Sequence, residues 1–66
     1  MLNMAELDKR IVQLQTSLDE IRIVQLQAVI FGQFDIVADC AVAIHQTISV
    51  IDRLLIAKLR LIAERN

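Results

Sequence analysis

One segment, residues 36–62, carries two apolar stripes side by side where a surface helix of a globular protein needs only one. Both stripes alternate steps of three and four residues, which is the spacing of one helix face. The first stripe is Ile36, Cys40, Ala43, Thr47, Val50, Leu54, Ala57 and Leu61. The second stripe is Val37, Ala41, Ile44, Ile48, Ile51, Leu55, Lys58 and Ile62. A helix with this much apolar surface needs more than one partner helix.

The N-terminal half predicts a second helix with a single stripe. Asn3 and Glu6 have the spacing of a capping box, and Leu2 and Leu7 stand at the staple positions around it, so the helix should begin at Met4. Its stripe is Met4, Leu7, Ile11, Leu14, Leu18, Ile21, Gln25 and Ala28. On its polar side we expect two ion pairs, Glu6–Arg10 and Asp19–Arg22. Residues 23–34 carry no charge, so the end of this helix should be buried on several sides.

Gly32, the only glycine, is predicted to close the first helix as a left-handed residue. We expect helices over about residues 4–31 and 36–64, a turn over 32–35, and Asp35 as the N-cap or first-turn acid of the second helix. The alternative is one helix of about 60 residues, because a glycine inside a helix costs only about 1 kcal/mol. A single long helix would pair in a two-stranded coiled coil, which needs only one apolar stripe per helix. The two stripes of residues 36–62 therefore favour a chain that folds back on itself as a hairpin.

The chain is too small to bury a large core alone, since it has 66 residues, and its single cysteine excludes an intrachain disulfide. Apolar residues make up 56% of it, and proline is absent. The sequence therefore predicts an all-α fold in one domain, residues 1–66. Its two long antiparallel helices form a helical hairpin that self-associates into a four-helix or larger bundle, most simply a homodimer.

The interface between copies is expected to draw on both helices. Its residues are Leu7, Ile11, Leu14, Leu18, Ile21, Gln25, Ile44, Thr47, Ile48, Ile51, Leu54, Leu55 and Ile62. Two of them, Gln25 and Thr47, are polar within apolar stripes, and we expect them to hydrogen-bond in the interior and to fix the register of the assembly. A larger protein would bind the uncharged half near the turn, where Val29, Ile30, Phe31 and Phe34 are the candidate contacts.

No pattern in the sequence indicates catalysis, a cofactor or a metal. His45 and Asp52 share a helix line but are about 10.5 Å apart along it, and Cys40 has no cationic neighbour to activate its thiol. No uncharged run reaches the length of a membrane span, and the N-terminus lacks the features of a signal peptide, so we expect a cytoplasmic protein. An interfacial membrane hairpin is disfavoured because Asp35 and Asp39 lie at its tip.

Two short strings, Leu2-Asn3-Met4-Ala5 and Gln33-Phe34-Asp35-Ile36, resemble the Rop family of plasmid copy-number regulators. Such proteins pair two hairpins into a four-helix bundle that binds RNA loops. That activity implies a basic, aromatic-bearing face on the first helix, and this chain offers only Lys9, Arg10 and Arg22 there. With a net charge of −1, nucleic acid is a disfavoured partner, and no site residue is carried over from the family.

These features are consistent with two functions. The first is a non-enzymatic hairpin homo-oligomer that acts as a small protein–protein interaction module: an adaptor, an inhibitor or anti-activator of a larger protein, or an engineered bundle. The alternative is a Rop-like RNA-binding dimer. RNA binding would weaken steeply with salt because phosphate contacts release counterions.

Overall fold

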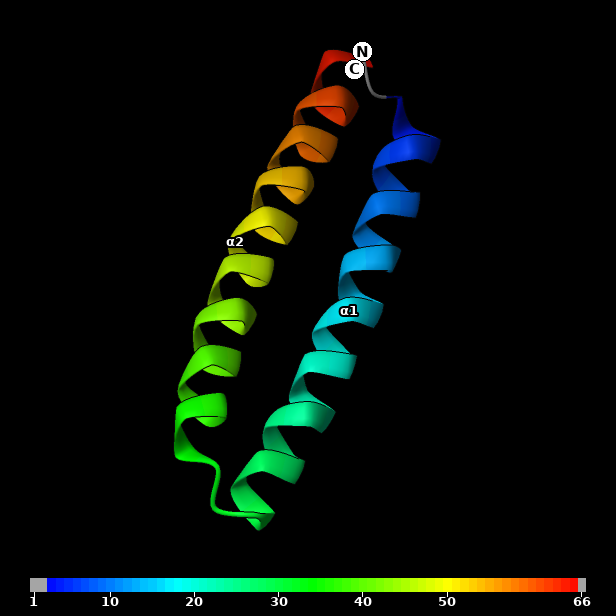
Figure 1. The fold of residues 1–66 in the computed structure, drawn as a ribbon. Coiled ribbons are helices and arrows are strands. Elements are labelled where there is room, and N and C mark those ends of the chain that lie inside the picture. The colour runs from blue at the N-terminus through cyan, green and yellow to red at the C-terminus, as the bar shows by residue number, and fades with distance from the viewer. Residues whose placement is uncertain (1–2, 66) are drawn as a thin grey trace.

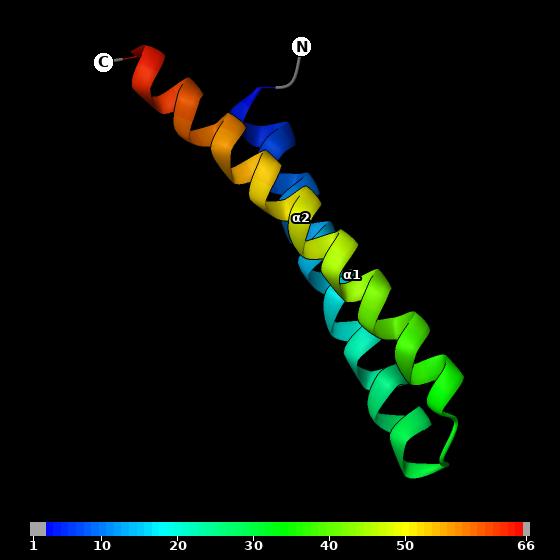
Figure 2. The same cartoon turned by 90° about the vertical axis from the view of Figure 1, so that its left-hand side faces the viewer.

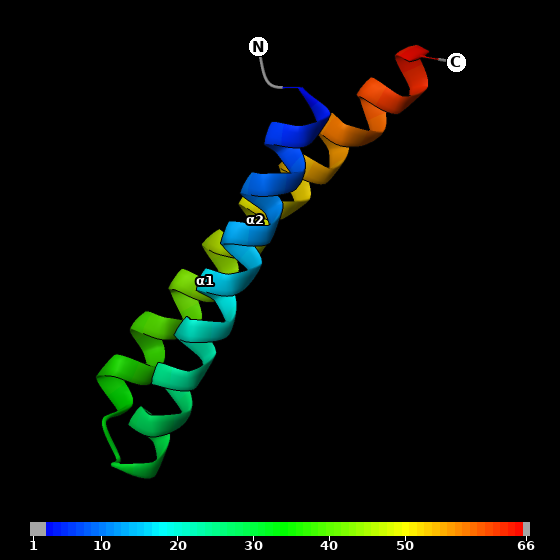
Figure 3. The same cartoon turned by 90° about the vertical axis from the view of Figure 1, so that its right-hand side faces the viewer.

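The computed structural model describes residues 3–65 and consists of two helices, α1 (Met4–Ile30) and α2 (Phe34–Arg65). They run antiparallel and pack against each other (Figure 1). The Cα atoms span 51 × 17 × 15 Å, so the molecule is a rod one helix pair thick. Figures 2 and 3 show the helices separating where α1 begins and α2 ends. The hairpin predicted from the sequence is confirmed, and the single long helix is excluded.

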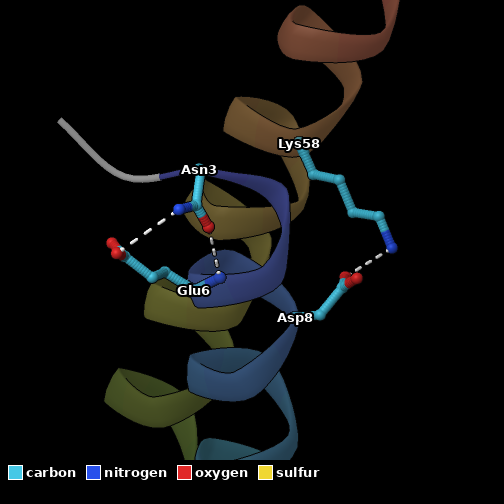
Figure 4. Close-up of polar contacts among 4 residues, drawn as sticks. All are labelled: Asn3, Glu6, Asp8 and Lys58. Atoms are coloured by element: carbon cyan, nitrogen blue, oxygen red, sulfur yellow. Dashed lines mark hydrogen bonds and ion pairs between the residues drawn. The ribbon is translucent and has the colours of Figure 1, made fainter.

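The capping box forms at the start of α1, as the sequence predicted (Figure 4). The backbone N–H of Glu6 donates to Oδ1 of Asn3 at 2.9 Å, and Nδ2 of Asn3 lies 3.5 Å from Oε1 of Glu6. Asn3 thereby satisfies one of the amide groups that a helix N-terminus leaves without a partner. Leu7 is almost fully buried, while its proposed staple partner Leu2 lies outside the described residues.

Gly32 closes α1 in the left-handed conformation, with φ = +68°. The N–H of Gln33 donates to the carbonyl of Ala28 at 2.8 Å, and the N–H of Gly32 donates to that of Val29 at 3.1 Å. These two bonds make a Schellman motif, which ends a helix in very few residues. Val37 then donates to the carbonyl of Gln33 at 3.1 Å, which is the first bond of α2.

The turn is therefore shorter than predicted, spanning residues 31–33, where 32–35 was expected. α1 ends at Ile30, and α2 begins at Phe34, two residues earlier than predicted. Asp35 consequently lies in the first turn of α2, where its carboxylate faces the positive end of the helix dipole.

The stripe predicted for the first helix faces α2 in full. Every member is buried or half-buried, and Leu7, Ile11, Leu18 and Ala28 are the most enclosed. On α2 the contacting line runs between the two predicted stripes and takes alternate members from each. This line, the α2 seam, consists of Val37, Cys40, Ile44, Thr47, Ile51, Leu54, Lys58 and Leu61. One helix packed over the middle of a wide apolar face leaves both edges of that face uncovered.

The ion pairs expected within α1 do not form. Within residues 3–65 the structure contains one salt bridge, between Asp8 and Lys58, and it joins the two helices (Figure 4). The carboxylate of Glu6 lies near the side-chain amide of Asn3, and Asp19 and Arg22 are both exposed to water. Exposed pairs of this kind contribute little, because water screens both charges.

Candidate interaction surfaces

Two rows of apolar side chains flank the α2 seam. We call the first the Ile48 row; it contains Ala41, Ile48, Leu55 and Ile62. We call the second the Val50 row; it contains Ile36, Ala43, Val50 and Ala57. The three large side chains of the Ile48 row are 37–42% exposed, so a substantial part of each is open to solvent.

The two rows look out on opposite sides of the hairpin. A shallow hollow between the helices is lined by Arg10, Gln13, Leu14, Ser17, Val50 and Leu54. Arg10 and Ser17 therefore accompany the Val50 row. Asp8, Gln15 and Arg22 form a line of α1 at heptad spacing, and this line lies on the other side of the hairpin. There Asp8 forms its salt bridge with Lys58, which lies on α2 between Leu55 and Ile62 of the Ile48 row. The Ile48 row thus shares its side with a polar line of α1.

Most of the residues predicted for the interface between copies lie inside the hairpin. Those packed between α1 and α2 are Leu7, Ile11, Leu14, Leu18, Ile21, Gln25, Ile44, Thr47, Ile51 and Leu54. The remaining three, Ile48, Leu55 and Ile62, form the open part of the Ile48 row. Sequence patterning identified apolar positions correctly but could not assign each one to an internal or an external partner.

The polar members of the stripes make two different kinds of hydrogen bond. Nε2 of Gln25 donates to the carbonyl of Val37 at 3.2 Å, which connects the helices near the turn. Oγ1 of Thr47 donates to the carbonyl of Ala43 at 2.8 Å, one turn earlier in α2. Gln25 thus contributes to the fit between the helices, whereas Thr47 is satisfied within its own helix.

The residues near the turn are the most exposed apolar group of the molecule. The candidate partner contacts Val29, Ile30, Phe31 and Phe34 are 51–76% exposed. Ile23 and Leu26 are also open to solvent. The expectation that late α1 is buried on several sides is wrong for the single hairpin, because a lone antiparallel partner covers one side only.

No group of three or more His, Cys, Asp or Glu side chains within residues 3–65 could hold a metal ion. Cys40 is a buried free thiol in the α2 seam, and His45 is exposed. Lys9, Arg10 and Arg22 fall on three different lines of α1, so they do not form one basic surface.

By its length and composition, α2 is apolar enough to cross a membrane. Its longest uncharged run, residues 40–51, is shorter than a membrane span, and the expectation of no span came from such runs. A helix that carries apolar residues on three neighbouring lines for packing against other helices has the same composition.

No known protein family, characterised protein or solved structure matches this chain.

Proposed function

We propose that this protein is a non-enzymatic homo-oligomer, most simply a dimer whose two hairpins form a four-helix bundle. In the cytoplasm it would act as a small interaction module for a larger protein, as an adaptor, an inhibitor or an anti-activator. The observation that carries this proposal is the open Ile48 row, a continuous apolar line on the side of a helix that already has one partner.

The total surface supports self-association. A compact monomer of this mass, 7.5 kDa, would expose about 4,200 Å². The hairpin exposes 5,093 Å², an excess of about 900 Å² over that value. A standard protein–protein interface buries about 800 Å² on each partner. One copy covering another would thus bring the exposed surface to the level of an ordinary soluble protein.

The module would bind its target through the residues near the turn. Exposed aromatic side chains beside aliphatic ones are the usual components of interface hot spots, and Phe31 and Phe34 stand beside Ile30 with about three quarters of their surface open. In a dimer with its turns at opposite ends, each end of the rod would present one such group.

Light scattering and sedimentation equilibrium at micromolar concentration test the proposal. We expect a helical species of about twice 7.5 kDa, with a melting temperature that rises with protein concentration. Concentration must be read from peptide-bond absorbance, because the chain has no Trp or Tyr. A stably folded helical monomer whose melting temperature is independent of concentration would overturn the proposal.

A further inference from the structure

We infer that the second copy docks on the side of the hairpin that holds the Ile48 row, with the two turns at opposite ends of the bundle and a two-fold axis at Gln15. This inference rests on the proposed self-association and adds to it a face, a direction and a register. Three observations determine these: the chemistry of the two helix lines on that side, the spacing of their residues, and the level at which the helices pack.

The chemistry of the two lines sets the direction. On this side α2 presents the apolar Ile48 row, and α1 presents a line that is polar at Asp8, Gln15 and Arg22 and ends at Val29 near the turn. If both turns lay at the same end, each apolar row would face the polar line of the other copy, and charged groups would lose water without gaining partners. With the turns at opposite ends, α2 packs on α2 of the second copy, and α1 packs on α1.

The spacing of the Ile48 row sets the register on α2. An antiparallel pair of identical helices is symmetric about one level of the chain. If that level lies between residues 51 and 52, Ile48 faces Leu55 of the second copy, and Ala41 faces Ile62. Each member of the row then meets an apolar residue, and the smallest member faces a large one.

The charges on α1 give a register of their own. If the symmetric level of this helix is at Gln15, then Asp8 faces Arg22 of the second copy, and Arg22 faces Asp8. Opposite charges thus meet twice, and the two Gln15 side chains meet on the axis, where amides can hydrogen-bond to each other. Asp8 would then lie between two cations, Lys58 of its own chain and Arg22 of the other.

These two registers place the axis at nearly the same level. Ile51 packs in one core cluster with Ile11 and Leu18, so its level on α1 is midway between them, at Leu14–Gln15. The level between residues 51 and 52, favoured by the apolar row of α2, therefore lies within about one residue, or about 1.5 Å, of the level at Gln15 that the charges of α1 favour. Asp52 of both copies also falls near this level, but on the exposed rim, where water screens the repulsion.

The opposite side of the hairpin does not give this agreement. The α1 and α2 lines there are centred on Ser17 and Val50, which lie together in the shallow hollow. The same antiparallel arrangement on that side would place Ile36 against Glu64 and Arg10 against Val24. Each contact would set an apolar side chain against a charge, so the Ile48 side is favoured.

Cysteine cross-linking separates these arrangements, because the residue on the axis faces its own copy. In a Cys40→Ala background, Gln15→Cys places a single thiol on the proposed axis, whereas Ser17→Cys places it on the axis of the opposite side. A disulfide forms readily when the Cα atoms lie about 4.4–6.8 Å apart. We expect the Gln15→Cys chain to form a covalent dimer under mild oxidation at least about tenfold faster than the Ser17→Cys chain, and light scattering before oxidation gives the mass of each.

The outcomes distinguish the register from the self-association itself. Cross-linking at Gln15 with a dimer mass supports both. A dimer mass with faster cross-linking at Ser17, or with none at either position, overturns the inferred face or direction and leaves the proposed function standing. A folded monomer before oxidation overturns both.

A second pair of variants needs no thiol: Ile48→Glu, on the Ile48 row, should weaken the dimer at least about tenfold, while Ile56→Glu, on the outer side of α2, should change the dissociation constant of the dimer by less than about twofold.

Discussion

Nζ of Lys58 lies 2.6 Å from Oδ1 of Asp8, at the end of the hairpin away from the turn. Lys58 occupies a position in the α2 seam where the neighbouring members Leu54 and Leu61 are apolar. Its aliphatic stem can lie along α1 while its ammonium group reaches the surface, an arrangement common for lysine at the edge of an apolar contact. The side chains of Lys58 and Asp8 are 33% and 52% exposed, so the pair remains partly hydrated.

We expect this salt bridge to contribute little to stability. The coupling between Asp8 and Lys58 should be roughly 0.2–1 kcal/mol, because water screens a pair that is this exposed. A double-mutant cycle with Asp8→Asn and Lys58→Met, measured by chemical denaturation at one protein concentration, gives the coupling between the two side chains. The coupling should shrink in 1 M salt. A coupling above about 2 kcal/mol would mean that the pair is buried in the assembled protein.

The second prediction concerns the turn. Gly32→Ala should lower the free energy of unfolding by about 1–2 kcal/mol, since a side chain disfavours the left-handed conformation. An added Cβ would meet nothing within 4 Å, so the whole cost lies in the backbone. Gly32→Asn is the matched control and should cost less, because asparagine tolerates this conformation better. Equal stability of all three proteins would show that the turn rearranges in solution.

The helix content, the hairpin and the closing glycine could all be predicted from local patterns. The capping box at Asn3 and the stripe of α1 depend on residues three or four positions apart, and such signals are complete within one segment. The position of the α2 seam could not be predicted in this way. Two adjacent stripes have identical periodicity, and only the packing of α1 shows that it covers the line between them.

For the same reason, the residues predicted for an interface between copies could not be divided in advance between the interior of the hairpin and its outer surface. A long apolar side chain gives the same signal whether it faces its own hairpin or another chain, so Leu54 and Leu55 look alike in the sequence. In the structure Leu54 contacts the core cluster, and Leu55 remains 41% exposed. The turn boundaries were also missed by one or two residues, because the Schellman motif closes α1 through backbone bonds that leave little trace beyond Gly32.

The third prediction separates the two polar residues of the stripes. Gln25→Leu should raise the melting temperature and broaden the distribution of oligomers, since it replaces a half-buried amide that ties α1 to Val37 with a side chain that fits several arrangements. Thr47→Val is the matched control. It should leave the oligomer distribution unchanged, because the Thr47 hydroxyl bonds only within α2. Native mass spectrometry and thermal unfolding by circular dichroism provide both measurements.

A less stable Gln25→Leu protein that stays a single species would show instead that Gln25 belongs to a hydrogen-bond network whose other members lose their partner.

The last prediction concerns the exposed residues at the turn. The double substitution Ile30→Glu with Phe34→Glu should leave the mass and the melting temperature of the homo-oligomer nearly unchanged. Both side chains are at least 70% exposed, and Ile30 lies about 22 Å along α1 from the inferred axis at Gln15. The same variant should no longer retain the larger protein that co-purifies with the wild-type chain from its native host, because two carboxylates would have to be desolvated on binding.

A control with Gln46→Glu and Ile56→Glu adds the same charge on the outer side of α2, away from the turn, and should keep the partner. If the turn variant instead falls apart into smaller or unfolded species, then Ile30 and Phe34 belong to the core of a higher oligomer, in which three or four hairpins cover these residues among themselves.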